Sequence, residues 1–265
     1  REPASRAGGS VEPALIEALA TDLGELHEKQ EERSLSPLLL LSFVLHRLWE
    51  GGEGGVLKQA DYQRLGGLRH ALSRSADAAW AALDAAGPVA ERLDATRWRS
   101  GIHYLRGNLH FPRGDIEGCL REHARSLELA RAAGASEQEA AALGGLGDAE
   151  YVRGRMVSAY GAYRSCVELS RQRGLGRTEI ANLPMVAFTR WFVDDTRSAL
   201  AEAHGAIAAA AKVGQLRAQT IAHHAGCFCS RVLLDLPEGW RHAEPALTLA
   251  RQLGARRFEA EALAL

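Results

Sequence analysis

Four side chains that can bind metal lie close together near the C-terminal end of the chain: His223, His224, Cys227 and Cys229. On a helix, His223 and Cys227 share one face because they are four residues apart, and imidazole and thiolate are both zinc ligands. A closed zinc site needs four converging ligands, and the sequence offers no second cluster to complete one. Cys227 also falls in a register that small residues occupy elsewhere. We therefore interpret the cluster as helix packing and predict no metal and no cofactor.

Catalytic motifs are equally sparse. Asp194 and Asp195 lie at an expected turn between helices, where carboxylates commonly cap the following helix. No serine has the context of a nucleophile elbow. A phosphate-binding loop is missing from the sequence, because Lys58 follows Gly54-Gly55 without the spacing that such a loop requires. We predict that the chain is not an enzyme.

A basic stripe follows one helical face between residues 99 and 113. Its members are Arg99, His103, Arg106, His110 and Arg113, spaced by three and four residues. The stripe could dock an acidic segment or a phosphate group. It could also be a solvated face whose side chains pair with neighbouring acids, and we favour this second interpretation.

Composition narrows the classes of partner. The 265 residues carry a formal charge of −1, so no general attraction to nucleic acid or to an anionic membrane is expected. The four cysteines are too few for a secreted disulfide scaffold, and no apolar run is long enough to span a membrane. We expect a cytoplasmic protein. Because the sequence begins at Arg1 and stops within a helical pattern, we also expect an excerpt of a longer protein.

The segment 144–174 recurs along the chain with a constant period of about 40 residues. Gly154 and Gly174, which lie at the expected ends of its helices, have equivalents at the same period in Gly114, Gly134, Gly214 and Gly254. The position of the small residue Gly147 is occupied in the other copies by Gly107, Ala187 and Cys227. A fixed period of this length indicates stacked helical hairpins. The sequence predicts an all-α fold with repeats at 90–134, 135–174, 175–214 and 215–254 and an incomplete last helix at 255–265.

A different helical module is predicted at 11–87, after a disordered lead-in at 1–10. Its last helix, from Leu68, should end before Gly87-Pro88, because proline removes a backbone donor and glycine often terminates helices. For the same reason Pro245 should kink or interrupt a helix of the fourth repeat.

The array resembles the tetratricopeptide (TPR) repeat, whose pattern appears as Leu146-Gly147, Gly154, Ala159 and Cys166. Three segments of the array are similar to the repeat region of bacterial regulators that join AAA-type ATPase and nucleotidyl cyclase domains. They are RGNLHFPRGD, ALGGLGDAEYVRGRM and RRFEAEALAL. Three segments of the module at 11–87 resemble the module that follows the nucleotide-binding core of bacterial STAND ATPases. They are EPALIEAL, SPLLLLSFVLHRLWE and GGVLKQADYQRLGGLRHALSRSADAAWAAL. Both resemblances imply a TPR-like superhelix in a signalling protein.

The TPR resemblance also implies a partner groove. When the repeat positions that line the groove of TPR proteins are transferred to this sequence, the resemblance implies that eight residues line the groove. They are Tyr104, Asn108, Asp148, Arg153, Phe188, Phe192, His224 and Phe228. The alternative is that the three phenylalanines are core or inter-repeat contacts. The implied function is a non-catalytic scaffold that relays the binding of a protein or peptide, or contact with an NTPase domain of the same parent chain. Two alternatives stay open, namely a segment of a DNA- or effector-linked transcription regulator and a purely structural fragment.

Overall fold

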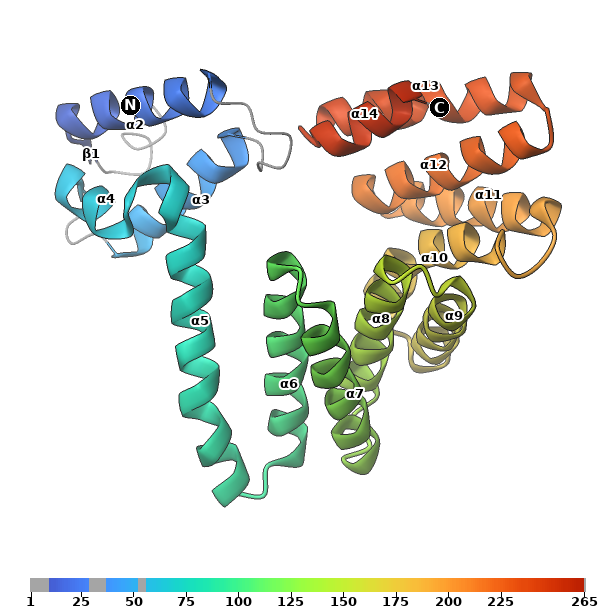
Figure 1. Cartoon of the computed structure of the whole chain (residues 1–265), viewed down its shortest axis with the longest axis horizontal. Coiled ribbons are helices and arrows are strands. Elements are labelled where there is room, and N and C mark those ends of the chain that lie inside the picture. Colours follow the sequence, from blue (N-terminus) through green and yellow to red (C-terminus); the bar gives the residue numbers. More distant parts are fainter. Residues whose placement is uncertain (1–9, 29–36, 52–55, 265) are drawn as a thin grey trace. The chain divides into compact units, whose positions relative to one another are not determined.

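The structure is a computed structural model that describes residues 10–28, 37–51 and 56–264. It divides into two compact units, with the boundary between Ala81 and Ala82, inside the long helix α5 (Gly67–Arg92) (Figure 1). Each unit is described separately below. None of the described helices is long and apolar enough to cross a membrane.

The first unit is a small helical module with one short strand pair. Strand β1 (Ser10–Val11) pairs in parallel with β2 (Val56–Leu57), and helices α2 (Pro13–Glu28), α3 (Pro37–Gly51) and α4 (Gln59–Leu65) pack around them. The buried core is Leu15, Leu19, Val44, Leu48, Leu57, Tyr62, Leu68 and Ala71. Residues 1–9 of the predicted lead-in lie outside the described residues, whereas Ser10 belongs to β1.

Tyr62 begins the segment Tyr62-Gln63-Arg64-Leu65-Gly66-Gly67, which leads from α4 into α5. Its ring is buried, and its hydroxyl donates to Asp22 of α2 and accepts from the backbone N–H of Leu68 at 3.0 Å. Gly66 and Gly67 both adopt positive φ angles, 79° and 73°, which a residue with a side chain rarely adopts. The glycine pair thus makes the sharp turn that brings the start of α5 against the tyrosine.

The predicted end of α5 at Gly87-Pro88 is wrong, because the helix continues through Pro88 to Arg92. A proline inside a helix removes one hydrogen bond but need not end the helix if neighbouring contacts hold the turn. Arg106 supplies such contacts in the preceding turn. Its Nη2 donates to the Leu83 carbonyl at 3.4 Å and to an Asp84 carboxylate oxygen at 2.6 Å.

The second unit is a regular array of antiparallel helices. Its helices are α6 (Thr96–His110), α7 (Ile116–Ala132), α8 (Ser136–Val152), α9 (Met156–Arg173), α10 (Gly176–Arg190), α11 (Thr196–Lys212), α12 (Leu216–Val232), α13 (Leu236–Gln252) and α14 (Arg256–Ala264). A short 3₁₀ turn, η2 (Phe111–Arg113), follows α6. The starting positions of the nine helices are evenly spaced along the described array, and two successive helices make one repeat. The all-α fold with TPR-like hairpins is confirmed.

The turns between these helices repeat one backbone geometry. A residue with positive φ recurs in the array at a regular interval, and all but two of these positions hold glycine, as at Gly114 (75°) and Gly154 (73°). Asp94 and Leu234 are the exceptions, with φ of 47° and 59°. The turn after α10 differs, since Asp194 is not among the residues with positive φ. Asp195 follows it and caps α11 by accepting from the Ser198 N–H at 2.8 Å. The predicted capping role is therefore confirmed for Asp195, whereas Asp194 pairs with Arg190.

The array has two layers of helices. We call α6, α8, α10, α12 and α14 the A helices, and α7, α9, α11 and α13 the B helices. Each A helix packs against the next A helix, whereas consecutive B helices touch little. Because consecutive A helices lie closer together than consecutive B helices, the stack curves towards the A layer, which forms its concave side.

Small residues let the two layers approach closely. A Cβ atom at Gly107 would lie 2.6 Å from the His123 ring, and one at Gly147 would lie 2.6 Å from the Tyr163 ring. Ala187 packs on Ala203 in the third repeat. In the fourth, Gly226 leaves the space for the His242 ring. Pro245 does not interrupt α13, which runs to Gln252.

Candidate partner-binding groove

The A helices form a continuous groove along the concave side of the array. One cleft of about 350 Å³ lies at α6, α8, α10 and α12, and a second of about 570 Å³ extends along α8, α10, α12 and α14. The two clefts share Asp148, Met185, Arg217 and Ile221, so they are two parts of one concave groove. We use the name concave groove for both clefts together.

Aromatic rings line the C-terminal part of this groove. Phe188 on α10 is the centre of the cluster, with ring centroids 5.8 Å from Tyr151 and 5.9 Å from Phe228. Trp191 meets Phe228 edge-on at 4.4 Å, and the Arg231 guanidinium lies 5.1 Å above the Phe228 ring. Aromatic faces next to a guanidinium can hold an apolar anchor side chain of a partner.

A carboxylate lies where the two clefts meet. Asp148 accepts a hydrogen bond from the buried Tyr163 hydroxyl at 2.6 Å. Desolvation by the groove walls raises the pKa of Asp148, while the Tyr163 hydrogen bond and the charge of Arg217 act in the opposite direction. Tyr163 therefore fixes the orientation of the acidic group at the centre of the groove.

Further charges lie near α14. Glu261 pairs with His224 at 3.3 Å and with Arg257 at 2.8 Å, and the His224 hydrogen bond is the main cause that lowers the pKa of Glu261. The second ring nitrogen of His224, Nε2, is buried and finds no hydrogen-bond partner among the residues that the structure describes. A hydrogen-bonding group of a ligand could satisfy it.

The structure places six of the eight predicted groove residues in the concave groove. Tyr104 and Asn108 line the N-terminal cleft, Asp148 lines both, and Phe188, His224 and Phe228 line the C-terminal cleft. The other two lie outside the lining. Arg153 instead pairs with Glu117 at 3.2 Å, and Phe192 packs on Trp191 at 4.3 Å.

Three arginines that the TPR register does not give form a ladder in the same groove. Arg177, Arg217 and Arg257 all line it, one repeat apart, at the second position of α10, α12 and α14. Their recurrence at the period of the repeat is the signal that could have revealed them. Among the described residues, neither Arg177 nor Arg217 forms an ion pair, and the charge of Arg217 acts on Asp148, which lines the same groove. Guanidinium groups placed in this way can bind an incoming acidic group.

The basic stripe mostly pairs with acids of its own chain. His103 contacts Glu122 at 2.7 Å, Arg106 contacts Asp84 at 2.6 Å, and His110 contacts Asp115 at 2.8 Å. Arg99 and Arg113 complete the stripe on α6 and η2. These pairs favour the interpretation of the stripe as a solvated, ion-paired face over that of a docking face.

The metal-like cluster of the sequence does not converge in the structure. His224 turns to Glu261 in the groove, while His223 contacts His242 of α13, with 3.2 Å between their Nδ1 atoms. Cys227 and Cys229 are buried free thiols, like Cys119 and Cys166. Burial raises the pKa of Cys229 to about 11, so this thiol stays protonated near neutral pH.

Comparisons with known proteins fit both units. Residues 1–93 match the model of the family Novel STAND NTPase 1 (nSTAND1). No curated protein sequence matches the chain. BtubC (BKLC) from P. vanneervenii is 14% identical and superposes with a TM-score of 0.55, covering 69% of this chain and 74% of that one.

Two further solved structures cover 94% of this chain at 13% identity. One is a Rap protein complexed with competence and sporulation factor, with a TM-score of 0.57 and 77% of its own length covered. The other is a STAND protein with a tetratricopeptide repeat sensor from Pyrococcus horikoshii, with a TM-score of 0.50 and 40% of its length covered. The first segment is thus similar to STAND NTPases, and the array has the fold of TPR-like helical repeat proteins.

Proposed function

We propose that the array is the sensor of a STAND-type regulator and binds a protein segment in its concave groove. The observation that carries this proposal is the groove itself, in which an aromatic surface lies beside an arginine ladder. Such a lining suits an extended segment that offers an apolar anchor to Phe188 and Phe228 and acidic groups to Arg177 and Arg217. The chain acts as a scaffold, without catalysis of its own.

The match of residues 1–93 to a STAND NTPase family supports the second half of the proposal. Occupancy of the groove changes the activity of an NTPase core to which the first unit connects the array. The Pyrococcus horikoshii protein likewise combines a STAND protein with a tetratricopeptide repeat sensor. In the natural gene product, groove substitutions should therefore change the rate of ATP hydrolysis. A product that hydrolyses no ATP, or hydrolyses it at a rate indifferent to these substitutions, would contradict the relay.

Groove substitutions are expected to weaken partner binding. Phe228→Ala removes an aromatic anchor, and Arg217→Glu places a like charge against an acidic partner group. Because a hot-spot side chain contributes about 2 kcal/mol or more, each change should lower affinity by at least about tenfold. The measurement is the affinity of the partner that the immobilised chain retains from extracts of its native cell, determined afterwards with the purified partner.

A matched control uses arginines of the B helices. Arg125→Glu and Arg164→Glu make the same charge change on exposed side chains of α7 and α9, which are not part of the groove lining. These variants should bind the partner like the wild type. Equal loss of binding in both sets would show that net charge, and not the groove, determines binding. Salt-dependent DNA binding that Arg217→Glu abolishes would instead favour the transcription-regulator alternative.

A further inference from the structure

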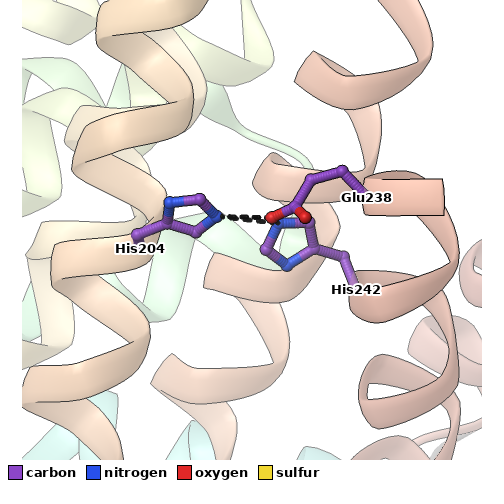
Figure 2. A group of neighbouring side chains, drawn as sticks. All are labelled: His204, Glu238 and His242. Carbon is purple, nitrogen blue, oxygen red and sulfur yellow. Dashed lines mark hydrogen bonds and ion pairs between the residues drawn. The ribbon is translucent and has the colours of Figure 1, made fainter. Parts of the chain in front are cut away.

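A cluster of two histidines and one glutamate lies on the B layer, outside the groove (Figure 2). His204 comes from α11, and Glu238 and His242 come from successive turns of α13. His204 Nε2 lies 2.9 Å from Glu238 Oε1 and 3.2 Å from His242 Nε2, and the remaining edge, from His242 Nε2 to Glu238 Oε1, is 3.5 Å. Within the described parts of the chain, this is the one group of three potential ligands whose donor atoms converge.

The triangle has the dimensions of one face of a metal coordination shell. Imidazole nitrogen and carboxylate oxygen bind Zn²⁺ at about 2.0–2.2 Å. Ligands at that distance are separated by about 2.9–3.5 Å, from octahedral to tetrahedral angles. The three observed edges of 2.9, 3.2 and 3.5 Å fall within this range.

Outer contacts already orient two of the three ligands. Arg241 donates to Glu238 Oε2 at 2.8 Å, which leaves Oε1 facing the histidines. His223 contacts Nδ1 of His242 at 3.2 Å, so the opposite nitrogen, Nε2, points to the centre of the triangle. Partners of this kind fix the tautomer and the ring orientation of metal-binding histidines.

The exposure of the side chains leaves a path for an ion. The side chain of His242 is 4% exposed and that of Glu238 18%, whereas that of His204 is 49% exposed. The triangle is therefore anchored on the protein side and open on the His204 side. Three protein ligands leave at least one coordination position for water.

We propose that His204, Glu238 and His242 bind one divalent transition-metal ion of the Zn²⁺ type. Two imidazoles and a carboxylate suit zinc and its neighbours in the first transition row and not Mg²⁺ or Ca²⁺, which prefer oxygen ligands. The ion joins α11 to α13, two B helices that otherwise touch little. Its effect is to fix the spacing of the third and fourth repeats, from which the C-terminal half of the groove is built.

The test is a titration of the whole chain, freed of metal with a chelator, with ZnCl₂ in a calorimeter. The wild type should bind one ion at micromolar zinc. His204→Ala and Glu238→Gln should each weaken binding by more than about tenfold, since each removes one of only three ligands. His204 is half exposed and Gln keeps the shape of Glu238, so neither change should disturb the fold, which circular dichroism checks. Co²⁺ gives a second readout, because at a concentration that saturates the wild type its visible spectrum should show a bound, nitrogen-ligated ion, and this signal should be weaker in both variants at the same concentration.

The control is His46→Ala. His46 forms an exposed histidine–glutamate pair with Glu50 at 3.3 Å, and among the described residues no second imidazole completes a group of three with this pair, so this variant should bind zinc like the wild type. Two results would overturn the proposal. One is a wild type without saturable zinc binding, and the other is binding that persists undiminished in His204→Ala and Glu238→Gln, which would place the ion elsewhere.

Discussion

Replacing Tyr163 with alanine is expected to lower the free energy of unfolding of the array by about 3–5 kcal/mol. The ring is fully buried between α8 and α9, where Gly147 leaves just enough room for it. Alanine would leave a cavity there, because the two helices cannot collapse by the width of a ring. The change would also remove the donor that binds Asp148 at the centre of the groove.

Urea unfolding followed by circular dichroism measures this effect, with two comparison variants. Tyr163→Phe keeps the ring but removes the hydrogen bond to a carboxylate, so it should cost about 1.5–3 kcal/mol and raise the pKa of Asp148 further. Val157→Ala, on the same helix at 68% exposure, should change stability by less than about 0.5 kcal/mol. A Tyr163→Ala variant as stable as Val157→Ala would show that the ring does not hold the second repeat together.

The second large effect is the loss of stability in acid caused by His123. Its ring is buried between Gly107 and Gly145, and its Nδ1 finds no partner among the described residues. Desolvation lowers the pKa of His123 to about 4, with His110 acting in the same direction and Glu122 against it. The unfolded chain takes up this proton near pH 6.5, whereas the folded chain does not. The contribution of neutral His123 is therefore complete above about pH 6.5 and is lost as the pH falls towards 4, by up to about 3 kcal/mol.

His123→Phe should remove this part of the pH dependence. The equivalent position of the next repeat holds Tyr163, so an aromatic ring fits the site. His223, whose pKa burial also lowers to about 4, makes a similar contribution in both proteins, so the difference between the two stability curves isolates His123. The measurement is urea unfolding at a series of pH values from 8 to 5. Parallel curves for the wild type and the variant would contradict a neutral, buried His123.

The repeat could be predicted from the sequence because its signals are local. A left-handed turn at the end of a helix favours glycine, and a close contact between helices favours a small residue. Both residue types therefore recur in the sequence at the period of the repeat. The continuation of α5 through Pro88 could not be predicted in this way. The contacts at this turn come from Arg106, which belongs to the next helix, α6, and donates to Leu83 and Asp84 just before the proline. Contacts between helices of this kind leave no local mark in the sequence.

The groove was only partly predictable for a similar reason. Register alone gives the positions on the concave side, and six of the eight predicted residues line it. Register does not show which acidic neighbour a long side chain pairs with. Arg153 forms an ion pair with Glu117 and does not line the groove. The histidine–glutamate triangle was missed because His204 is separated from Glu238 by a whole helix, α12. Only the stacking of consecutive repeats brings them together.

The central claim, that the concave groove holds a partner segment, can be tested by placing a photoreactive amino acid at single positions in the native cell. Ile221 lines both clefts, and Gly161 faces open space on the B helix α9. We expect position 221 to form a covalent adduct with one protein segment that carries acidic and apolar side chains, and position 161 to form none. Adducts of equal yield at both positions, or none at position 221, would contradict this claim.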